Sequence, residues 1–349
     1  MLARSHSLRT LTAGALLATP LLAVPLAVPA VAADWRPYGP PGMPAYSAQV
    51  TTTEPATASE SEGVVLIDTE LDYGTGEAAG TGLVLTSDGT VVTNHHVVEG
   101  STSITVTDPS TGTTYDADLV GYDAAADIAV LQLQDASGLT TIDPDRTTSV
   151  GEDVTAVGNA GGTGTLSAAD GSVTATGADI QVSDEQGGYE SLSDLIQVDA
   201  TVISGDSGGA LLDADDEVIG MNVAASTGYV IEGYAIPIST VLSLADRIEA
   251  GDTSGGIELG YGAALGIQVY AGSGGLQVGG VVRGGAADDA GLTAGSTLTS
   301  VDGTAVDTVD QIAAVLAEHA PGDSVRITWT DSSGSSHTAR ATLGQAPVA

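Results

Sequence analysis

Short runs of aliphatic and β-branched residues, separated by turn-forming residues, fill the chain from about residue 63 to residue 237. Two examples are Ser103-Ile-Thr-Val-Thr and Asp153-Val-Thr-Ala-Val-Gly, each bordered by Gly, Asp, Ser or Thr. Runs this short and this evenly interrupted are typical of strands in a β-barrel or sandwich. The pattern therefore predicts a mostly β domain, which we place at residues 63–250.

A helix is predicted at the end of this first domain. From about Thr240 to Ala250, the apolar residues Val241, Leu244 and Ile248 recur at helical intervals, and Gly251 follows where a helix commonly ends. Residues 251–256 are polar and rich in glycine, which is typical of a linker.

A second, smaller α/β domain is predicted at residues 257–345. Strand-like segments at 267–270 and 325–329 flank one helix from Val309 to His319. Thr308 and Gln311 form the pattern of a capping box at the start of that helix, and Pro321-Gly322 follows its end. A module of this size after a larger domain is more typical of binding than of a second catalytic activity.

The N-terminal region is predicted to lie outside both folded domains. Arg4 and Arg9 precede a long run of Ala, Leu and Val that ends in Ala30-Val31-Ala32, which is the pattern of a secretory signal peptide over residues 1–33. An uncleaved membrane anchor is the alternative, since the apolar run is nearly long enough to span a bilayer. Residues 34–62 are rich in Pro, Gly, Thr and Ser and are predicted to form a flexible leader.

The charge of the chain excludes some partners. The sequence has 45 acidic and 8 basic residues and a formal net charge of -37, so nucleic acid and anionic lipid are disfavoured. Attraction of basic substrates is one interpretation of this charge, and solubility outside the cell is the interpretation that we favour. The chain has no cysteine, and its histidines lack ligand spacing, so we expect neither a disulfide nor a metal site, and no cofactor.

Three separated segments contain the residues of a nucleophilic triad. Ser207 lies in the turn Gly205-Asp206-Ser207-Gly208-Gly209, His96 precedes the pair Val97-Val98, and Asp127 heads an apolar strand. A serine hydroxyl needs a neutral imidazole to take its proton, and the imidazole needs a carboxylate to hold its tautomer. Each segment alone has an ordinary structural explanation. Together, in the order His, Asp, Ser, they predict a catalytic triad in a chymotrypsin-like double β-barrel.

The turn around Ser207 also predicts an oxyanion hole. The predicted oxyanion-hole residues are Gly205, Asp206 and Ser207, and the glycines allow the backbone to direct the amides of Gly205 and Ser207 at the developing oxyanion. Loss of one such donor typically costs about 3 to 4 kcal/mol of transition-state stabilisation.

The segments Thr93-Asn-His-His-Val-Val, Asp127-Ile-Ala-Val-Leu and Gln197-Val-Asp-Ala-Thr-Val-Ile-Ser-Gly-Asp-Ser-Gly-Gly resemble the HtrA (DegP-like) branch of trypsin-like serine proteases. The resemblance covers both domains and implies that the catalytic base is His96, with the side chain of His95 pointing elsewhere. It also implies homotrimers built through N-terminal aromatic residues. The candidate residues are Trp35, Tyr38 and Tyr46, although aromatic residues in a leader often form no interface.

Two departures from the family pattern concern loops. Asp206 stands where the family usually has Asn, and we expect its carboxylate to accept local backbone hydrogen bonds. Ala160 stands where a proline is common, which leaves the conformation of that loop open.

Specificity is predicted by analogy with the family. Thr201, six positions before Ser207, is expected at the base of the primary pocket, so a preference for Lys or Arg is disfavoured. The segment from Asn222 to Ser226 and the segment Gly233-Tyr234-Ala235 are expected to form the wall. We expect small or medium aliphatic side chains before the scissile bond, and the predicted substrate-binding residues are Thr201, Asn222, Val223, Ala224 and Tyr234.

The second domain resembles a PDZ domain at the sequence Ala264-Leu-Gly-Ile. The resemblance implies a loop that binds the carboxylate of a peptide C-terminus, and a groove in which the peptide adds to the strand from Ile267 to Tyr270. The predicted peptide-binding residues are Leu265, Gly266, Ile267, Ile312 and Leu316. Apolar positions on such a helix often face the core, which is the alternative for Ile312 and Leu316.

The sequence predicts an exported serine endopeptidase that cleaves unfolded or damaged polypeptides, with a PDZ-like domain that binds peptide C-termini or regulates the protease. The alternatives are a catalytically silent peptide-binding or chaperone-like protein and a processing protease of narrow specificity.

Overall fold

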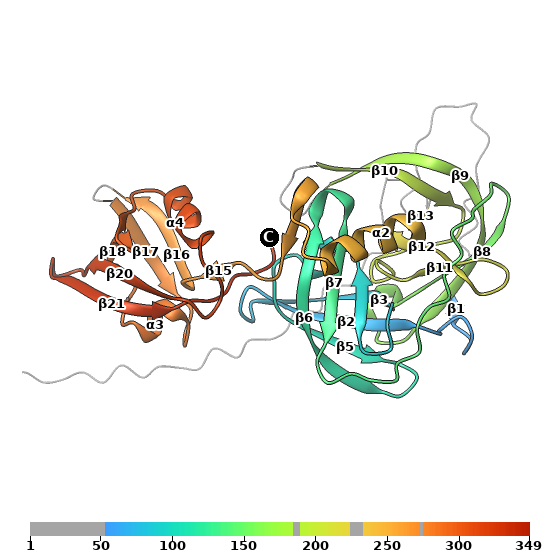
Figure 1. The fold of residues 1–349 in the computed structure, drawn as a ribbon, viewed down its shortest axis with the longest axis horizontal. Coiled ribbons are helices and arrows are strands. Elements are labelled where there is room, and N and C mark those ends of the chain that lie inside the picture. Colours follow the sequence, from blue (N-terminus) through green and yellow to red (C-terminus); the bar gives the residue numbers. More distant parts are fainter. Residues whose placement is uncertain (1–52, 184–188, 224–232, 273–274) are drawn as a thin grey trace, which may run out of the picture. The chain divides into compact units, whose positions relative to one another are not determined.

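The computed structural model describes residues 53–183, 189–223, 233–272 and 275–349. The predicted signal peptide and the aromatic residues of the predicted leader lie outside these residues. Figure 1 shows two sheet-rich regions that follow one another along the chain, the first with α2 against its strands and the second with α3 and α4. The mostly β fold with a smaller α/β domain after it is confirmed.

The first sheet closes into a barrel. Its strand order is β14-β6-β5-β2-β3-β4-β7, and an additional pairing of β6 with β7 joins the strands into a ring. The strands are β2 (Val64–Leu71), β3 (Gly76–Val84), β4 (Thr90–Thr93), β5 (Ser101–Asp108), β6 (Thr113–Asp123), β7 (Ile128–Leu133) and β14 (Ile257–Leu259).

The second sheet closes in the same way. Its order is β1-β9-β10-β13-β12-β11-β8, and β8 also pairs with β9. The strands are β1 (Glu54–Pro55), β8 (Asp153–Gly158), β9 (Ser167–Ser183), β10 (Tyr189–Val198), β11 (Ala210–Leu212), β12 (Val218–Val223) and β13 (Gly233–Pro237). Residues Glu54 and Pro55 thus belong to a sheet, although they fall within the predicted leader.

One hydrophobic cluster joins the two barrels. It combines buried residues of the first sheet, such as Leu83 and Val130, with buried residues of the second sheet, such as Leu195 and Met221. Two further clusters fill the individual barrels. Because strands of both barrels contribute to one core, the fold can bring together side chains that are far apart in the sequence.

Helix α2 (Ile238–Glu249) confirms the predicted helix at the end of the first domain. Its residues Val241, Leu244 and Ile248 are buried in the shared cluster, and it packs against strands of both sheets. Gly251 follows with a φ of 75°, a conformation that glycine adopts without steric cost.

The sheet of the first barrel extends past the predicted linker. After η3 (Ser254–Gly256), β14 pairs with β6, with Glu258 opposite Tyr122. The predicted second domain thus begins with residues that belong to the first barrel. Ile257 is the physical reason, because it is 3% exposed and lies in the shared core.

The C-terminal region has its own core. A sheet of order β16-β17-β18-β20-β21, with β19 beside β18, packs around residues such as Leu276, Ile327 and Trp329. Its elements are β15 (Ala263–Ala264), β16 (Ile267–Gly272), β17 (Gly275–Val281), α3 (Ala286–Asp289), β18 (Thr297–Val301), β19 (Thr304–Ala305), α4 (Val309–Leu316), β20 (Ser324–Thr330), β21 (Ser336–Thr342) and β22 (Gly344–Gln345). The predicted capping box is present at α4, where Thr308 accepts from the amide of Gln311 and the Gln311 side chain accepts from Thr308.

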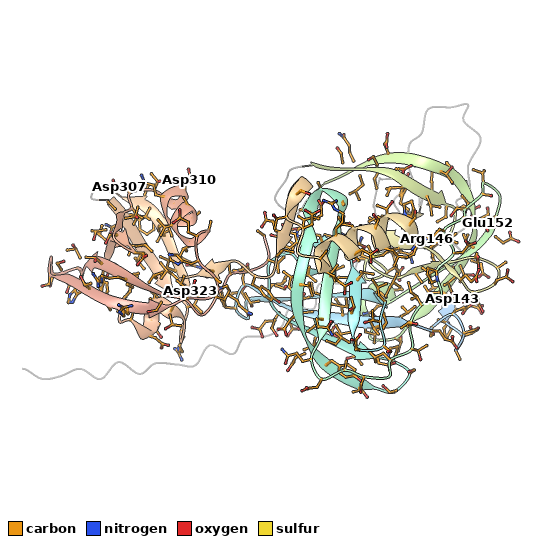
Figure 2. All side chains as sticks on the ribbon, viewed as in Figure 1. Asp143, Arg146, Glu152, Asp307, Asp310 and Asp323 are labelled. Atoms are coloured by element: carbon orange, nitrogen blue, oxygen red, sulfur yellow. The ribbon has the colours of Figure 1, made fainter. Side chains whose placement is uncertain are left out.

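Acidic side chains lie on the surface of both regions, as the labelled residues Asp143, Glu152, Asp307, Asp310 and Asp323 illustrate (Figure 2). Among the described residues, no helix combines the length and the apolar character needed to cross a membrane.

Candidate active site

The candidate base His96 lies on a helix of one turn. Strand β4 leads through Asn94 into α1 (His95–Val98), in which Val97 and Val98 are buried. The two valines anchor the helix on the first barrel, while the side chain of His96 remains 36% exposed. The local sequence thus places an accessible imidazole on a fixed support.

The candidate carboxylate Asp127 lies between η1 (Ala124–Ala126) and β7. Its φ of 53° is in the left-handed region, and the residue is 1% exposed. The side chain of Asn94 donates to the main-chain oxygen of Asp127 over 3.0 Å, which links this turn to the start of α1.

Asp127 and His96 make three contacts. The carboxylate accepts from the His96 amide at 3.0 Å and from His96 Nδ1 at 2.9 and 3.0 Å. Because an ionised carboxylate only accepts hydrogen bonds, the ring proton is on Nδ1. In the neutral ring, Nε2 is then the basic atom, which is the arrangement that a general base for a hydroxyl requires.

The loop around Ser207 depends on two glycines in the left-handed region. Gly205 has a φ of 97° and Gly208 a φ of 82°. A Cβ at position 205 would collide with the carbonyl oxygen of Asn159, and one at position 208 with that of Thr81. Ser207 itself is 4% exposed. Glycine is thus required at positions 205 and 208 for two reasons. The backbone there has a positive φ, and it lies too close to neighbouring carbonyl oxygens to leave room for a Cβ.

Thr81 joins this loop to the first barrel. Its amide donates to Ser207 O at 2.9 Å, and its hydroxyl donates to Gly205 O at 2.8 Å. The hydroxyl of Thr93, two residues before His95, donates in turn to Thr81 O at 2.7 Å. Sequence reasoning missed Thr81. The only signal was its position between Gly80 and Gly82, in a strand where glycine permits close packing.

Of the residues predicted for the oxyanion hole, Asp206 forms main-chain hydrogen bonds within its own loop. The amide of Asp206 donates to Ile203 O at 3.0 Å within the loop, and its carbonyl accepts from Gly209 at 2.9 Å. A role for the amides of Gly205 and Ser207 in the oxyanion hole stays a prediction.

The carboxylate of Asp206 is buried in the nucleophile loop. Its Oδ2 accepts from the amide of Ile203 at 2.9 Å, which confirms the expected local backbone bond. Within the described residues, the other oxygen, Oδ1, is buried without a hydrogen-bond partner, and Gly158 packs directly against the residue. Burial raises the pKa of Asp206 to about 6, and the bond from Ile203 opposes this shift.

The residues predicted for substrate specificity are buried where the structure describes them. Thr201, Asn222, Val223 and Tyr234 are 6%, 0%, 2% and 6% exposed. The Asn222 amide donates to Val157 O at 3.2 Å and to Ala210 O at 2.8 Å, so its side chain links neighbouring strands. Val223 and Tyr234 belong to the shared core. Ala224 lies outside the described residues, and a pocket role for this set stays a prediction.

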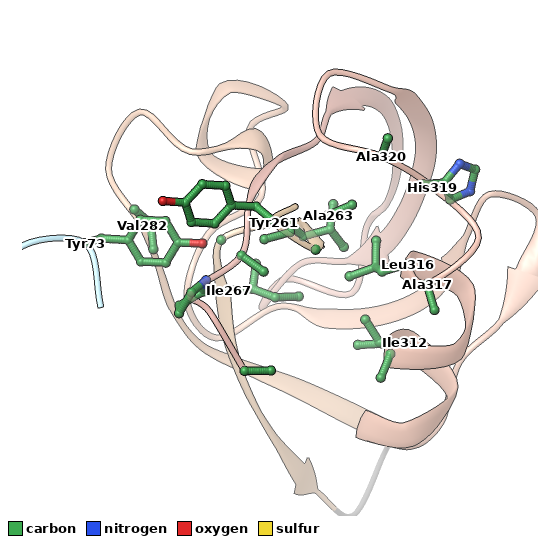
Figure 3. A pocket seen from close by; sticks show the side chains of 18 of the residues that line it. Tyr73, Tyr261, Ala263, Ile267, Val282, Ile312, Leu316, Ala317, His319 and Ala320 are labelled. Atoms are coloured by element: carbon green, nitrogen blue, oxygen red, sulfur yellow. The ribbon is translucent and has the colours of Figure 1, made fainter. Parts of the chain in front are cut away.

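The residues predicted to bind peptides lie around a cavity of about 1350 Å³ (Figure 3). Leu265 and Ile312 are 1% and 6% exposed and belong to the core of the C-terminal region, whereas Ile267 and Leu316 are partly exposed at the cavity. Gly266 has a φ of 67° and accepts from the amide of Val282 at 2.8 Å. The loop is therefore shaped by a glycine in a conformation that other residues adopt rarely.

One edge of strand β16 is open among the described strands. It stands at the end of the sheet order and pairs with β17 along its length, from Ile267 opposite Val281 to Gly272 opposite Gly275. An unpaired edge beside a helix is a surface to which an extended peptide can add as a further strand.

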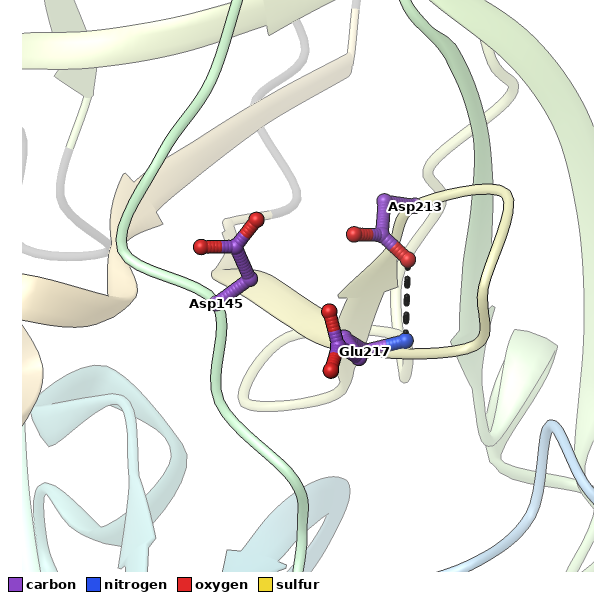
Figure 4. A group of neighbouring side chains, drawn as sticks. All are labelled: Asp145, Asp213 and Glu217. Atoms are coloured by element: carbon purple, nitrogen blue, oxygen red, sulfur yellow. Dashed lines mark hydrogen bonds between the residues drawn. The ribbon is translucent and has the colours of Figure 1, made fainter.

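A cluster of three carboxylates lies outside the candidate site. Asp145, Asp213 and Glu217 place oxygen atoms within 4.8 Å of one another, and Asp213 Oδ1 accepts from the amide of Glu217 at 2.9 Å (Figure 4). Partial burial and the charges of neighbouring aspartates raise the pKa of Glu217. Sequence reasoning did not predict this cluster, because its members come together only through the loops after β7 and β11.

Two barrels, with a His–Asp pair on the first and a glycine-bounded serine in a loop of the second, followed by a separate α/β region, define a trypsin-like peptidase with a PDZ domain. The family model of the trypsin-like peptidase domain matches residues 80–221, and that of the PDZ domain matches residues 277–330.

The serine protease PepD of Mycobacterium tuberculosis is 32% identical over 333 residues, which cover 88% of this chain and 69% of PepD. A probable periplasmic serine endoprotease, DegP-like, of Brucella suis is 36% identical over 269 residues, covering 72% of this chain. The chain thus belongs to the HtrA/DegP family of trypsin-like serine endoproteases.

The chain spans 69% of PepD but only 50% of the Brucella DegP-like protein. Among solved structures, "HtrA-type protease AlgW with tripeptide" is 28% identical to this chain, with a TM-score of 0.48, and covers 84% of this chain and 99% of AlgW.

Proposed function

We propose that the chain is an exported endopeptidase that cleaves unfolded or damaged polypeptides through an acyl-enzyme. Ser207 attacks the scissile carbonyl, Nε2 of His96 accepts the hydroxyl proton and later donates it to the leaving amine, and Asp127 holds the imidazole. The amides of Gly205 and Ser207 stabilise the oxyanion. The observation that supports this proposal most strongly is the contact of Asp127 with Nδ1 of His96, at 2.9 and 3.0 Å.

The first experiment separates an active protease from a silent, chaperone-like protein. Casein is incubated with wild type and with Ser207→Ala, and fragments are counted by mass spectrometry. We expect cleavage at many sites by wild type and none by the variant. Equal cleavage by both proteins would refute the serine mechanism, and cleavage at a single site would favour a processing protease of narrow specificity.

We propose that the primary pocket accepts small or medium aliphatic side chains, since Thr201 rather than an acidic residue is expected at its base. A library of peptides that vary before the scissile bond tests this, with Ser207→Ala as the control for contaminating proteases. Preferred cleavage after Lys or Arg would contradict the assignment.

We also propose that the PDZ domain binds peptide C-termini. The open edge of β16 supports strand addition, and the turn at Gly266 supports a loop whose amides bind a carboxylate. Calorimetry with one aliphatic peptide, prepared with a free and with an amidated C-terminus, tests this directly. We expect the amidated peptide to bind at least about tenfold more weakly, because it lacks the carboxylate. Equal affinities would refute carboxylate recognition.

Export through residues 1–33 is proposed from the signal-peptide pattern, and names such as "periplasmic" among the relatives support it. N-terminal sequencing of the exported protein should find a start near Asp34, whereas an intact N-terminus would indicate an anchor. Homotrimers through Trp35, Tyr38 and Tyr46 remain a proposal from the resemblance. Light scattering on the exported protein tests their existence.

A further inference from the structure

The last residues of the chain return to the first barrel. Strand β22 pairs with β15, and Ala346 then donates to Gly262 O at 2.7 Å. The segment of residues 346–349, which we call the C-terminal strap, continues from there to the start of β5.

Val348 anchors the strap on the barrel. Its carbonyl accepts from the amide of Gly100 at 2.8 Å, and its amide donates to Ser101 O at 3.0 Å, so both of its main-chain groups are paired. Its side chain is 4% exposed and belongs to the core cluster that also contains Val97 and Val98 of α1. The strap is thus part of the wall against which α1 packs.

His95 connects α1 directly to the strap. Its Nε2 lies 2.7 Å from the main-chain oxygen of Ala349, and because a carbonyl or carboxylate oxygen only accepts, Nε2 donates this bond. The ring is stacked on Tyr122, with centroids 4.7 Å apart, and the Tyr122 hydroxyl donates to Glu258 on β14. A histidine that is 3% exposed therefore has its ring held on one face and its donor paired.

A helix as short as α1 cannot fix its own position. It contains four residues, and the amide of Glu99 closes its single turn on His95 O. Isolated helices of this length are unstable, so their geometry is imposed by the groups that surround them. Asp127 holds α1 through His96, and the strap and Tyr122 hold it through His95.

We propose that His95 and the C-terminal strap are positioning elements of the catalytic histidine. This inference rests on the proposed function, because it assigns the strap a part in the same reaction. His95 touches no reacting atom and acts through its neighbour, keeping the imidazole of His96 in register with Ser207. A misplacement of about 1 Å at a catalytic group can cost about 100-fold in rate.

The test compares four variants of the full chain with wild type. His95→Ala removes the donor to Ala349, whereas His95→Gln retains an amide that can donate to the same oxygen. Val348→Ser weakens the anchor of the strap, and Val150→Ser makes the same change at a residue that is 63% exposed, as the matched control. Active enzyme is counted by end-point labelling with a fluorophosphonate, and kcat and KM are measured on one peptide substrate.

We expect His95→Ala and Val348→Ser to lower kcat per labelled site by about 10- to 100-fold, with KM changed by less than about threefold. His95→Gln should recover most of the loss, and Val150→Ser should match wild type. If kcat per labelled site is unchanged in both His95→Ala and Val348→Ser while only their melting temperatures fall, the strap is merely structural and the inference is wrong.

Two outcomes separate the inference from the function on which it rests. If wild type shows no hydrolysis that depends on Ser207, the proposed function fails. If wild type is active and the strap variants match it, only the inference fails. Should His95→Ala not fold, the comparison of Val348→Ser with Val150→Ser decides the question.

Discussion

Replacement of Asp206 by asparagine should change how stability depends on pH. Asp206 is 5% exposed, and one of its carboxylate oxygens is buried without a partner among the described residues. Burial raises its pKa from the ordinary value of 3.8 to about 6. The folded protein therefore holds this proton more tightly than the unfolded chain does, and folding is favoured at low pH.

The size of the effect follows from the shift. A pKa that moves from 3.8 to about 6 corresponds to about 3 kcal/mol, at about 1.4 kcal/mol per unit. This contribution is fully present below pH 3.8 and is lost as the pH rises through about 6. The asparagine side chain of the variant cannot ionise, and its amide oxygen can still accept from Ile203. The difference in unfolding free energy, Asp206→Asn minus wild type, should thus increase by up to about 3 kcal/mol between pH 4 and pH 8.

Urea denaturation at several pH values measures this difference, and the inactive Ser207→Ala background prevents self-cleavage during the measurement. Asp135→Asn, the same chemical change at an exposed aspartate, serves as the control. Parallel curves for Asp206→Asn and its parent, offset by a constant amount, would refute the conclusion that Asp206 titrates in the buried loop.

Three further changes test the site and the fold. Asp127→Asn should lower kcat by about ten-thousand-fold, since the amide no longer holds the Nδ1 proton; a fall below about tenfold in steady-state kinetics would contradict the assignment. Gly208→Ala should destabilise the fold by more than about 2 kcal/mol, because a Cβ there collides with Thr81 O at a φ of 82°; an unchanged melting curve would show that the loop can rearrange. Thr308→Ala should cost about 1 kcal/mol in the PDZ domain by removing the capping box of α4, whereas Thr308→Ser should restore it; urea denaturation of both variants measures the difference.

The elements with strong local signals were predictable. Helix α4 begins where Thr308 and Gln311 place a capping box, and α2 places Val241 and Ile248 in the core, as their spacing predicts. In such segments the spacing of the apolar residues and the capping residues predict the same helix, and tertiary packing favours that helix as well. The pairing of His96 with Asp127 could likewise be predicted, because each residue borders a buried apolar run that fixes its local position.

The features that sequence reasoning missed all depend on contacts between distant segments. β14 looked like the start of the second domain, but Ile257 completes the core of the first barrel. Thr81 links the nucleophile loop to β4 through hydroxyl and amide bonds that no periodicity reveals. A side chain with an ordinary local pattern acquires such a role only when the topology brings its partner close.

The comparison of His95 with His96 shows why function can divide between adjacent residues. On a helix, neighbouring side chains point about 100° apart, so two successive histidines cannot face the same partner. One ring contacts Asp127, and the other contacts Tyr122 and Ala349, which follows it by 254 residues in the chain. Both contacts constrain the same four-residue turn. The turn that contains the proposed catalytic base is therefore contacted from two directions, and an experiment that alters only the side facing Asp127 would leave the contacts of His95 untested.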